Sequence, residues 1–230
     1  MATTRSDHKS AADGAEASSR LRITEIFYSL QGETRTVGLA TVFVRLTGCP
    51  LRCGYCDTEY AFQGGEWMEQ GAILDRVASW PTRYVTVTGG EPLAQRSCRE
   101  LLIRLCDAGY QVSLETSGAL DIANIDERVV VVMDLKTPAS GESEKNRYEN
   151  IDLLKDTDQI KFVINSRKDY EWAKDSINQY QLDRRCEILI SPVYGSMDAA
   201  ELAQWVLQDS LPVRLQVQLH KLLWGEAQGH

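Results

Sequence analysis

The stretch Gly48-Cys49-Pro50-Leu51-Arg52-Cys53-Gly54-Tyr55-Cys56-Asp57-Thr58 carries three cysteines at C-x3-C-x2-C spacing. Three thiolates in one tight loop can bind three corners of an iron–sulfur cubane and leave its fourth iron without a protein ligand. A structural zinc site requires four protein ligands instead. The other cysteines are scattered, and no histidine lies between His8 and His220. The loop therefore favours a [4Fe-4S] cluster over a zinc knuckle or three ordinary buried thiols.

Charge and composition argue against several classes of protein. The 230 residues include 25 Lys+Arg against 33 Asp+Glu, a net charge of −8, which is unlike a protein that holds nucleic acid through its phosphates. Six cysteines in a chain of this length do not make a disulfide scaffold. The sequence shows neither a membrane span nor an apolar signal core. We therefore expect a cytoplasmic protein with no direct nucleic-acid or membrane partner.

Apolar patterning divides the chain into a tail and one domain. Residues 1–19 are rich in Ala, Ser, Asp and Glu without an apolar period, so we expect a disordered tail followed by a single catalytic domain over residues 20–230. Strands are expected at 21–28, 41–48, 84–88, 111–114, 129–133, 160–164, 187–190 and 213–219, and helices at 68–80, 97–108, 169–180 and 197–208. Alternating β and α units predict a parallel sheet. About six strands after Thr41 are too few for an eightfold barrel, so the predicted fold is α/β, a partial, open parallel β/α barrel.

Polar or glycine-rich motifs follow most of the predicted strands. They are the cysteine loop, Gly89-Gly90-Glu91, Glu115-Thr116, Asp134 with Lys136, Ser191-Pro192 and His220-Lys221. The carboxyl ends of parallel strands line one mouth, where active sites of such folds are built. The sequence therefore predicts that these motifs face a single cavity.

Several of these residues have a structural reading beside the functional one. Gly89-Gly90 can let the backbone approach a ligand, or can form a plain strand-to-helix turn. Asp134 and Lys136 can line a cofactor pocket or form a surface ion pair. His220 and Lys221 can be catalytic or merely structural. Arg45, inside an apolar strand, needs a partner, either an anionic substrate or an internal carboxylate such as Glu25 or Glu33.

The remaining cysteines and three tryptophans read as packing residues. Cys98, Cys106 and Cys186 fall in helical or strand contexts, and Trp80, Trp172 and Trp205 lie at helical positions. Thr58 offers a hard oxygen that suits Mg²⁺, although a loop threonine is usually a turn or cap residue.

Six segments carry a family pattern: Ile26-Phe27-Tyr28-Ser29-Leu30-Gln31-Gly32-Glu33, Val42-Phe43-Val44-Arg45-Leu46-Thr47-Gly48-Cys49, Cys53-Gly54-Tyr55-Cys56-Asp57-Thr58, Val87-Thr88-Gly89-Gly90-Glu91-Pro92, Glu115-Thr116-Ser117-Gly118 and Gln218-Leu219-His220-Lys221. Together they resemble the 7-carboxy-7-deazaguanine synthases, lyases of the radical S-adenosylmethionine (AdoMet) superfamily. The match covers roughly residues 21–221. Leu-Gln-Gly-Glu combined with Cys-Asp-Thr separates this family from other short radical AdoMet proteins.

The resemblance implies a reaction and its cofactors. The substrate would be 6-carboxy-5,6,7,8-tetrahydropterin, which loses ammonia during a ring contraction in the queuosine and 7-deazapurine pathways. The free iron of the cluster would bind AdoMet, one electron would cleave its sulfonium bond, and the 5′-deoxyadenosyl radical would take and later return a substrate hydrogen.

The resemblance also implies roles for individual positions. Cys49, Cys53 and Cys56 would ligate the [4Fe-4S] cluster, and Thr58 would help to hold Mg²⁺. The implied substrate contacts are Leu30, Gln31, Gly32, Arg45 and Thr88. The implied AdoMet contacts are Tyr55, Cys56, Asp57, Gly90, Asp134, Leu135, Lys136, Ser191, Pro192, Val193 and Tyr194.

The family further suggests a homodimer, an electron donor such as flavodoxin or ferredoxin, and a cytoplasmic setting. This sequence departs from the family pattern in two places. Thr34 stands where a second glycine is usual, and the residues after Lys221 differ from the usual ending, so we carry over no substrate contact from that tail.

Two other functions compete with this reading. A glycyl-radical activating enzyme shares the cysteine spacing, but residues 30–33 and Arg45 suit a small acidic ligand better. A non-catalytic zinc or cluster-binding module would explain the cysteines but not the motifs after the other strands.

Overall fold

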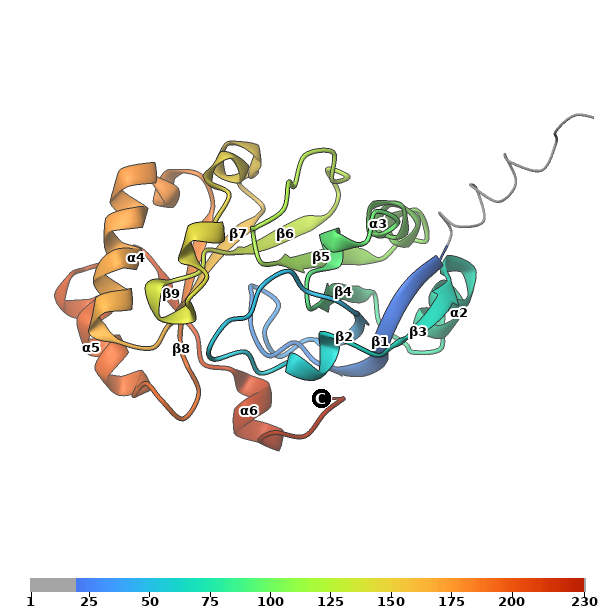
Figure 1. Cartoon of the computed structure of the whole chain (residues 1–230), viewed down its shortest axis with the longest axis horizontal. Coiled ribbons are helices and arrows are strands. Elements are labelled where there is room, and N and C mark those ends of the chain that lie inside the picture. Colours follow the sequence, from blue (N-terminus) through green and yellow to red (C-terminus); the bar gives the residue numbers. More distant parts are fainter. Residues whose placement is uncertain (1–19, 230) are drawn as a thin grey trace, which may run out of the picture.

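The computed structural model describes residues 20–229, so the expected tail at 1–19 lies outside the described residues. Nine strands form one sheet in the order β3-β1-β2-β4-β5-β6-β7-β8-β9 (Figure 1). The strands are β1 (Arg20–Leu30), β2 (Ala40–Leu46), β3 (Glu66–Glu69), β4 (Tyr84–Gly89), β5 (Gln111–Thr116), β6 (Val130–Asp134), β7 (Gln159–Ile164), β8 (Glu187–Pro192) and β9 (Arg214–Leu215). The helices are α2 (Gln70–Ala78), α3 (Cys98–Asp107), α4 (Arg167–Tyr180), α5 (Ala199–Gln208) and α6 (Leu219–Trp224).

The sheet is an open, mostly parallel half of a barrel. Each pair from β2–β4 to β8–β9 is parallel, whereas β1 pairs antiparallel with both β2 and β3. The strand order does not return to its start, so the sheet is not closed. The predicted partial, open parallel β/α barrel is confirmed.

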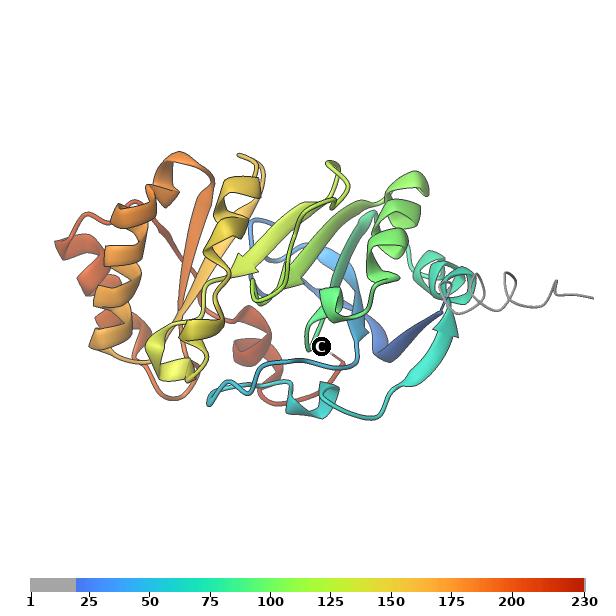
Figure 2. The ribbon, with the colours of Figure 1, turned by 45° about the horizontal axis from the view of Figure 1, so that its top comes forward.

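Helices cover the outer face of this sheet, which explains why its strands are so apolar. In Figures 1 and 2, α3 and α4 lie along one face of the sheet, and α6 with the cysteine segment lies by the other. Leu101, Leu102 and Leu105 of α3 are fully buried, as are Ile160 and Phe162 of β7. A strand covered on both faces reads as a continuous apolar run, as β6 does. None of the helices between residues 20 and 229 is long and apolar enough to cross a membrane.

The loop between β1 and β2 runs across the inside of the half-barrel. Gln31 Nε2 donates to Thr86 Oγ1 in the middle of β4 at 3.1 Å. Further along the loop, the Arg35 amide donates to Gln159 of β7 at 3.2 Å, and Gln216 beyond β9 donates to the Thr34 carbonyl at 2.6 Å. The loop therefore bridges the two ends of the open sheet and forms a floor inside it.

Two expected elements differ in the structure. The strand expected at 213–219 is only two residues long, and His220 and Lys221 lie in a short helix, α6, rather than at a strand end. The ladder stops because the Leu219 amide donates to the Gly32 carbonyl at 3.0 Å, which draws the chain away from β8 toward the β1–β2 loop. The helix expected at 68–80 begins at Gln70, because residues 66–69 pair with β1 as an edge strand.

Candidate active site

A cavity of about 590 Å³ opens on the inner side of the sheet. Its volume is within the usual range for small-molecule sites. Its walls come from the cysteine loop, the carboxyl ends of β4, β5 and β6, the β1–β2 loop, and the chain from Gln218 to Gly229. The prediction that these motifs share one cavity is met by Gly89, Glu115 and Asp134 at strand ends and by His220 in α6, all of which line it. It is not met by Ser191-Pro192, which is absent from the described wall.

The three loop cysteines lie together at this cavity. Cys49, Cys53 and Cys56 are free thiols, partly accessible, and all three line the cavity. Burial raises the pKa of Cys49 and of Cys53, and the Cys56 thiol raises both further. The Leu51 amide donates to Cys49 Sγ at 3.4 Å, and Thr58 Oγ1 lies 3.7 Å from Cys56 Sγ. The loop thus presents three neighbouring sulfur ligands on one wall.

The arrangement of these thiols distinguishes between two kinds of metal site. Between residues 20 and 229, no three His, Cys, Asp or Glu side chains are placed to hold one metal ion. A cubane needs a different geometry, because each of its three thiolates binds a separate iron. Three free thiols of one loop beside an open cavity fit a [4Fe-4S] cluster with one iron free.

The turn after β4 fixes the cysteine loop against the sheet. A Cβ at Gly90 would lie 2.3 Å from the Gly48 carbonyl oxygen and 2.8 Å from the Cβ of Cys49, so only glycine fits. The Glu91 amide donates to that same carbonyl at 2.7 Å. The backbone at Gly90 therefore touches the cysteine loop directly, and both segments line the same cavity wall.

The side chain of Glu91 points away from the cavity. Its carboxyl is fully buried and accepts from the amides of Leu93 and Ser117 and from the hydroxyls of Thr116 and Ser117. Glu91 therefore ties the turn after β4 to the turn after β5. Of the Gly-Gly-Glu motif, only the two glycines line the cavity.

Two of the expected substrate contacts converge on the carboxyl group of Glu115, to which the sequence assigned no individual role. Gln31 Nε2 donates to one oxygen of Glu115 at 3.2 Å, and Thr88 Oγ1 donates to the other at 3.0 Å. Withdrawal from bulk solvent raises the pKa of Glu115, and Glu33 raises it further against the opposing effect of Lys161. The sequence predicted that the Glu115-Thr116 motif faces the cavity, but it gave no signal that Gln31 and Thr88 would bind this carboxyl group.

Arg45 forms the internal salt bridge that the sequence offered as one of two partners for its charge. Its Nε donates to Glu25 Oε1 at 2.7 Å, so the internal salt bridge forms, and Tyr60 donates to the same oxygen at 2.8 Å. The guanidinium also lies 5.7 Å from the centre of the Phe27 ring and lines the cavity. Among the described residues its Nη groups have no hydrogen-bond partner, which leaves two donors for an anion.

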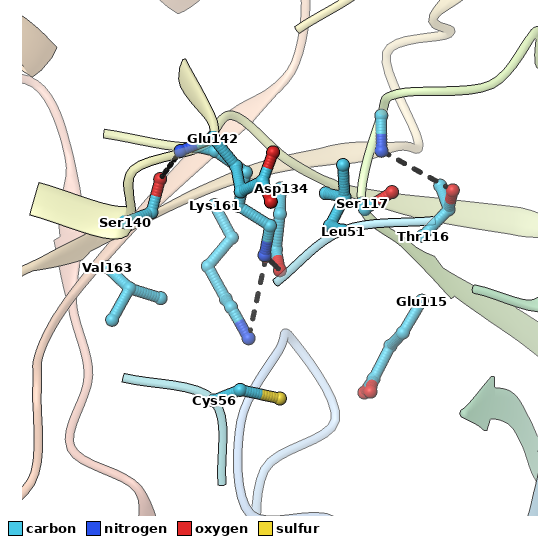
Figure 3. Close-up of polar contacts among 12 residues, drawn as sticks. Leu51, Cys56, Glu115, Thr116, Ser117, Asp134, Ser140, Glu142, Lys161 and Val163 are labelled. Carbon is cyan, nitrogen blue, oxygen red and sulfur yellow. Dashed lines mark hydrogen bonds and ion pairs between the residues drawn. The ribbon is translucent and has the colours of Figure 1, made fainter. Parts of the chain in front are cut away.

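Four charged side chains of alternating sign lie in a row along the cavity wall. Lys136 Nζ lies 2.6 Å from one oxygen of Asp134, and Lys161 Nζ lies 3.6 Å from the other (Figure 3). Lys161 in turn lies 2.6 Å from Glu33 Oε2. Burial by itself would raise the pKa of Asp134. The positive charges of Lys136 and Lys161 outweigh this effect and hold that pKa below its ordinary value. The expected pair of Asp134 and Lys136 therefore forms, at the cavity rather than on the outer surface.

The β1–β2 loop and α6 meet at the opposite wall. A Cβ at Gly32 would lie 2.2 Å from His220 Nδ1, so glycine is required for this close approach. His220 lines the cavity, and burial lowers its pKa. Lys221 pairs with Glu226 at 2.7 Å and lies 3.8 Å from Asp57. Residues 225–229, in the tail from which we carried over no substrate contact, also line the cavity.

The remaining expected site residues divide into two groups. Those that line the cavity are Leu30, Tyr55, Asp57, Thr58, Val193 and Tyr194. Leu135, Ser191 and Pro192 are buried and are not among the described residues of the cavity wall. Leu135 follows Asp134 by one position, so strand alternation turns its side chain into the core.

Comparisons with known proteins show which superfamily and which relatives this chain resembles. Residues 43–181 match the Radical SAM superfamily. The chain is 44% identical over 219 residues to the 7-carboxy-7-deazaguanine synthase of Koribacter versatilis, covering 89% of this chain and 97% of that protein. It is also 44% identical over 208 residues to the enzyme of that name from Chlorobaculum tepidum, covering 89% and 94%.

A solved structure shares the fold. The crystal structure of QueE from Escherichia coli superposes with a TM-score of 0.75 at 21% identity, covering 93% of this chain and 100% of that one. At this identity the likeness concerns the fold alone.

Proposed function

This chain belongs to the radical SAM superfamily and, within it, to the 7-carboxy-7-deazaguanine synthases, and we propose that it converts 6-carboxy-5,6,7,8-tetrahydropterin to 7-carboxy-7-deazaguanine with loss of ammonia. The observation that carries the proposal is the composition of the cavity. Its walls combine three cluster-type cysteines with Gln31, Arg45 and Glu115, which suit a small ligand that bears both a carboxylate and N–H donors.

The cofactor end of the cavity is built around the cysteine loop. Cys49, Cys53 and Cys56 would hold a [4Fe-4S] cluster, which with bound AdoMet supplies one-electron radical chemistry. Tyr55, Asp57, Gly90, Asp134 and Lys136 surround the same space as candidate AdoMet contacts, with Val193 and Tyr194 at its edge. A charged cofactor gains from such a site because carboxylate and ammonium groups are already paired and oriented there.

The substrate end offers groups that match a carboxylated pterin. The free Nη donors of Arg45 suit the carboxylate, since guanidinium and carboxylate can form two parallel hydrogen bonds. Glu33, Glu115 and the Gln31 amide provide acceptors for the amino and ring N–H groups of the pterin. Thr58 would contribute a hydroxyl to a Mg²⁺ near the substrate carboxylate.

We further propose an electron donor of the flavodoxin or ferredoxin type, a homodimer and a cytoplasmic setting. These three rest on family membership. Cys49, Cys53 and Cys56 must remain reduced thiols to bind a cluster, which favours a reducing compartment.

One anaerobic turnover tests the function. Reconstituted protein is incubated with reductant, AdoMet, Mg²⁺ and the carboxytetrahydropterin, and the products are read by mass spectrometry. We expect a product lighter than the pterin by one ammonia, in excess over the AdoMet consumed. Deoxyadenosine without that product would keep the radical class but reject the substrate. Neither product from cluster-loaded protein would favour a non-catalytic cluster-binding role.

A further inference from the structure

Lys161 is a largely buried lysine that the roles described so far do not use. It lies in β7 opposite Asp134 of β6, on the strand face that carries Val163 into the cavity wall. The alternate residues Ile160 and Phe162 are fully buried on the other face. Only 12% of the Lys161 side chain is exposed, so its ammonium group requires partners within the protein.

Its closest partner is Glu33 of the β1–β2 loop. Lys161 Nζ lies 2.6 Å from Glu33 Oε2 but 3.6 Å from Asp134 Oδ1, and the other Asp134 oxygen is already held by Lys136. Figure 3 shows Lys161 extending from its strand past Asp134 toward the open space of the cavity. Lys161 is therefore the main counter-ion of Glu33 and only a secondary one for Asp134.

The second oxygen of Glu33 lacks a partner. Oε1 is buried and accepts no hydrogen bond from any described residue, although Glu33 lines the cavity and is only 8% exposed. A buried acceptor without a donor is costly, and an unpartnered oxygen on a residue that lines a cavity points to a donor that a ligand supplies. One oxygen of Glu33 is thus fixed by Lys161, and the other is left for a ligand.

We propose that Lys161 is a positioning residue, which keeps the Glu33 carboxylate ionised and aligned so that Oε1 accepts a hydrogen bond from an N–H group of the substrate. The inference rests on the proposed function, because it concerns how the same cavity holds its pterin. Lys161 itself need not touch the substrate. Its contribution is to hold in place, and keep charged, a carboxylate that burial would otherwise protonate.

The other charged groups around Glu33 cannot replace Lys161. His220 faces Glu33 from α6, but burial lowers the pKa of its imidazole, which weakens it as a cation near neutral pH. Asp134 and Glu115 face Glu33 from β6 and β5 and oppose its ionisation. Burial also raises the pKa of Glu33, yet the net direction is downward, with Lys161 the largest cause of the lowering.

The first test uses the ligand-free protein and its unfolding by urea. In the wild type the pKa of Glu33 is below its ordinary value of 4.5, so its stabilising contribution is present above that pH and is lost only in acid. In Lys161→Met, burial together with Asp134 and Glu115 should raise that pKa above 4.5. The stability of Lys161→Met should then fall, relative to wild type, as the pH rises from about 5 to 8. The double variant Glu33→Gln/Lys161→Met should remove most of this pH dependence.

The second test measures pterin binding to cluster-loaded protein with AdoMet and without reductant, so that no turnover occurs. Lys161→Met should weaken binding by about tenfold near pH 6.5, the usual cost of losing a hydrogen bond to a charged group. The ratio of the variant's affinity to that of the wild type should recover at higher pH as Glu33 ionises. Lys161→Arg, which keeps the charge, should retain most of the affinity.

The outcomes separate this role from the function. If Lys161→Met stays folded, and its stability and its pterin affinity change with pH in the same way as those of the wild type, the positioning role is wrong while the proposed function stands. If the wild type binds no pterin and forms no deazaguanine, the proposed function fails, and the proposed role of Glu33 toward that substrate fails with it. If binding falls equally at every pH in Lys161→Met and Lys161→Arg, Lys161 acts by shape and not by charge, which also overturns the proposal.

Discussion

Among single side chains, Glu115 shows how a cavity changes the meaning of a residue. In the sequence it is one acidic residue in a strand-end motif. In the structure it accepts hydrogen bonds from Gln31 and Thr88, two positions expected to contact the substrate. The three side chains form one unit, so that a ligand that engages Gln31 or Thr88 also meets the Glu115 carboxyl.

The raised pKa of the Glu115 carboxyl should be detectable in the pH dependence of protein stability. Its pKa in the folded protein is raised above 4.5 by burial, so its stabilising contribution is present below that pH and is lost as the pH rises. Glu115→Gln, which cannot ionise, should therefore gain stability relative to wild type between about pH 5 and pH 8. Urea unfolding across this range measures the gain. Glu201→Gln on the exposed side of α5 is the control, and an equal gain there would contradict the assignment.

Thr34 stands where the family usually has glycine, and its backbone explains the preference. Its φ of 66° lies in the left-handed region, where a β-branched residue is strained. Its carbonyl nevertheless accepts the Gln216 hydrogen bond at 2.6 Å, so the turn is kept despite the strain.

A pair of variants isolates the strain at Thr34. Thr34→Gly and Thr34→Val both lose the hydroxyl that contacts Thr36, but only glycine adopts this backbone freely. We expect Thr34→Gly to be more stable than Thr34→Val by about 1 kcal/mol in chemical denaturation. Equal stabilities would show that the surrounding contacts, and not φ, control this turn.

Between neighbouring segments, the decisive contact joins the turn after β4 to the cysteine loop. Gly90 lies against Gly48 and Cys49, and Glu91 binds the Gly48 carbonyl through its amide. On its other side the Glu91 carboxyl holds Thr116 and Ser117 after β5. The position of the three thiols therefore depends on two strand ends that are distant in sequence.

Substituting Gly90 should displace the cysteine loop. In Gly90→Ala the new methyl group would overlap the Gly48 carbonyl at 2.3 Å, so the loop must move. We expect reconstituted Gly90→Ala to retain clearly less iron and sulfide per chain than wild type. Gly71→Ala in α2 is the matched control, because its Cβ meets nothing within 4 Å and alanine favours a helix by about 1 kcal/mol. Full cluster content in Gly90→Ala would show that the loop adapts.

At the scale of the whole molecule, the β1–β2 loop and the chain from α6 to Gly229 form the parts of the cavity wall that the open sheet does not provide. The β1–β2 loop crosses the interior and contacts β4, β7 and the chain after β9. The chain from α6 to Gly229 lies along the cavity with its end near the β1–β2 side of the sheet (Figure 1). The binding site is therefore assembled from both ends of the described chain.

Truncation tests the role of the last segment. Ending the chain after Gly225 removes a cavity wall and the Lys221–Glu226 ion pair, but no part of the buried core. Because Glu226 is exposed, we expect a loss of stability of no more than about 1 kcal/mol together with clearly weaker pterin or AdoMet binding. Glu226→Gln in the full chain keeps the wall and serves as the control. Unchanged binding after truncation would exclude a role for the tail.

The sequence predicted the fold and much of the site for identifiable reasons. Residues 129–133 are an unbroken apolar run, and residues 160–164 are apolar except for Lys161, so this pattern alone revealed the parallel sheet. The sequence made the last strand too long, because the Leu219–Gly32 hydrogen bond that accompanies the turn into α6 joins residues 187 positions apart. Leu135, Ser191 and Pro192 were expected at the cavity from motif positions, which do not specify the direction of a side chain.

By itself, the sequence determined the chemistry that this protein can support. The spacing of three cysteines in one loop and the order of the motifs along the chain are properties of the sequence, so they can be recognised without the folded structure. Only the tertiary structure decided which groups act together: Glu115 with Gln31 and Thr88, Lys161 with Glu33, and the tail with the cavity. The reason is physical, because burial and pairing of charges depend on distances between residues that lie far apart along the chain.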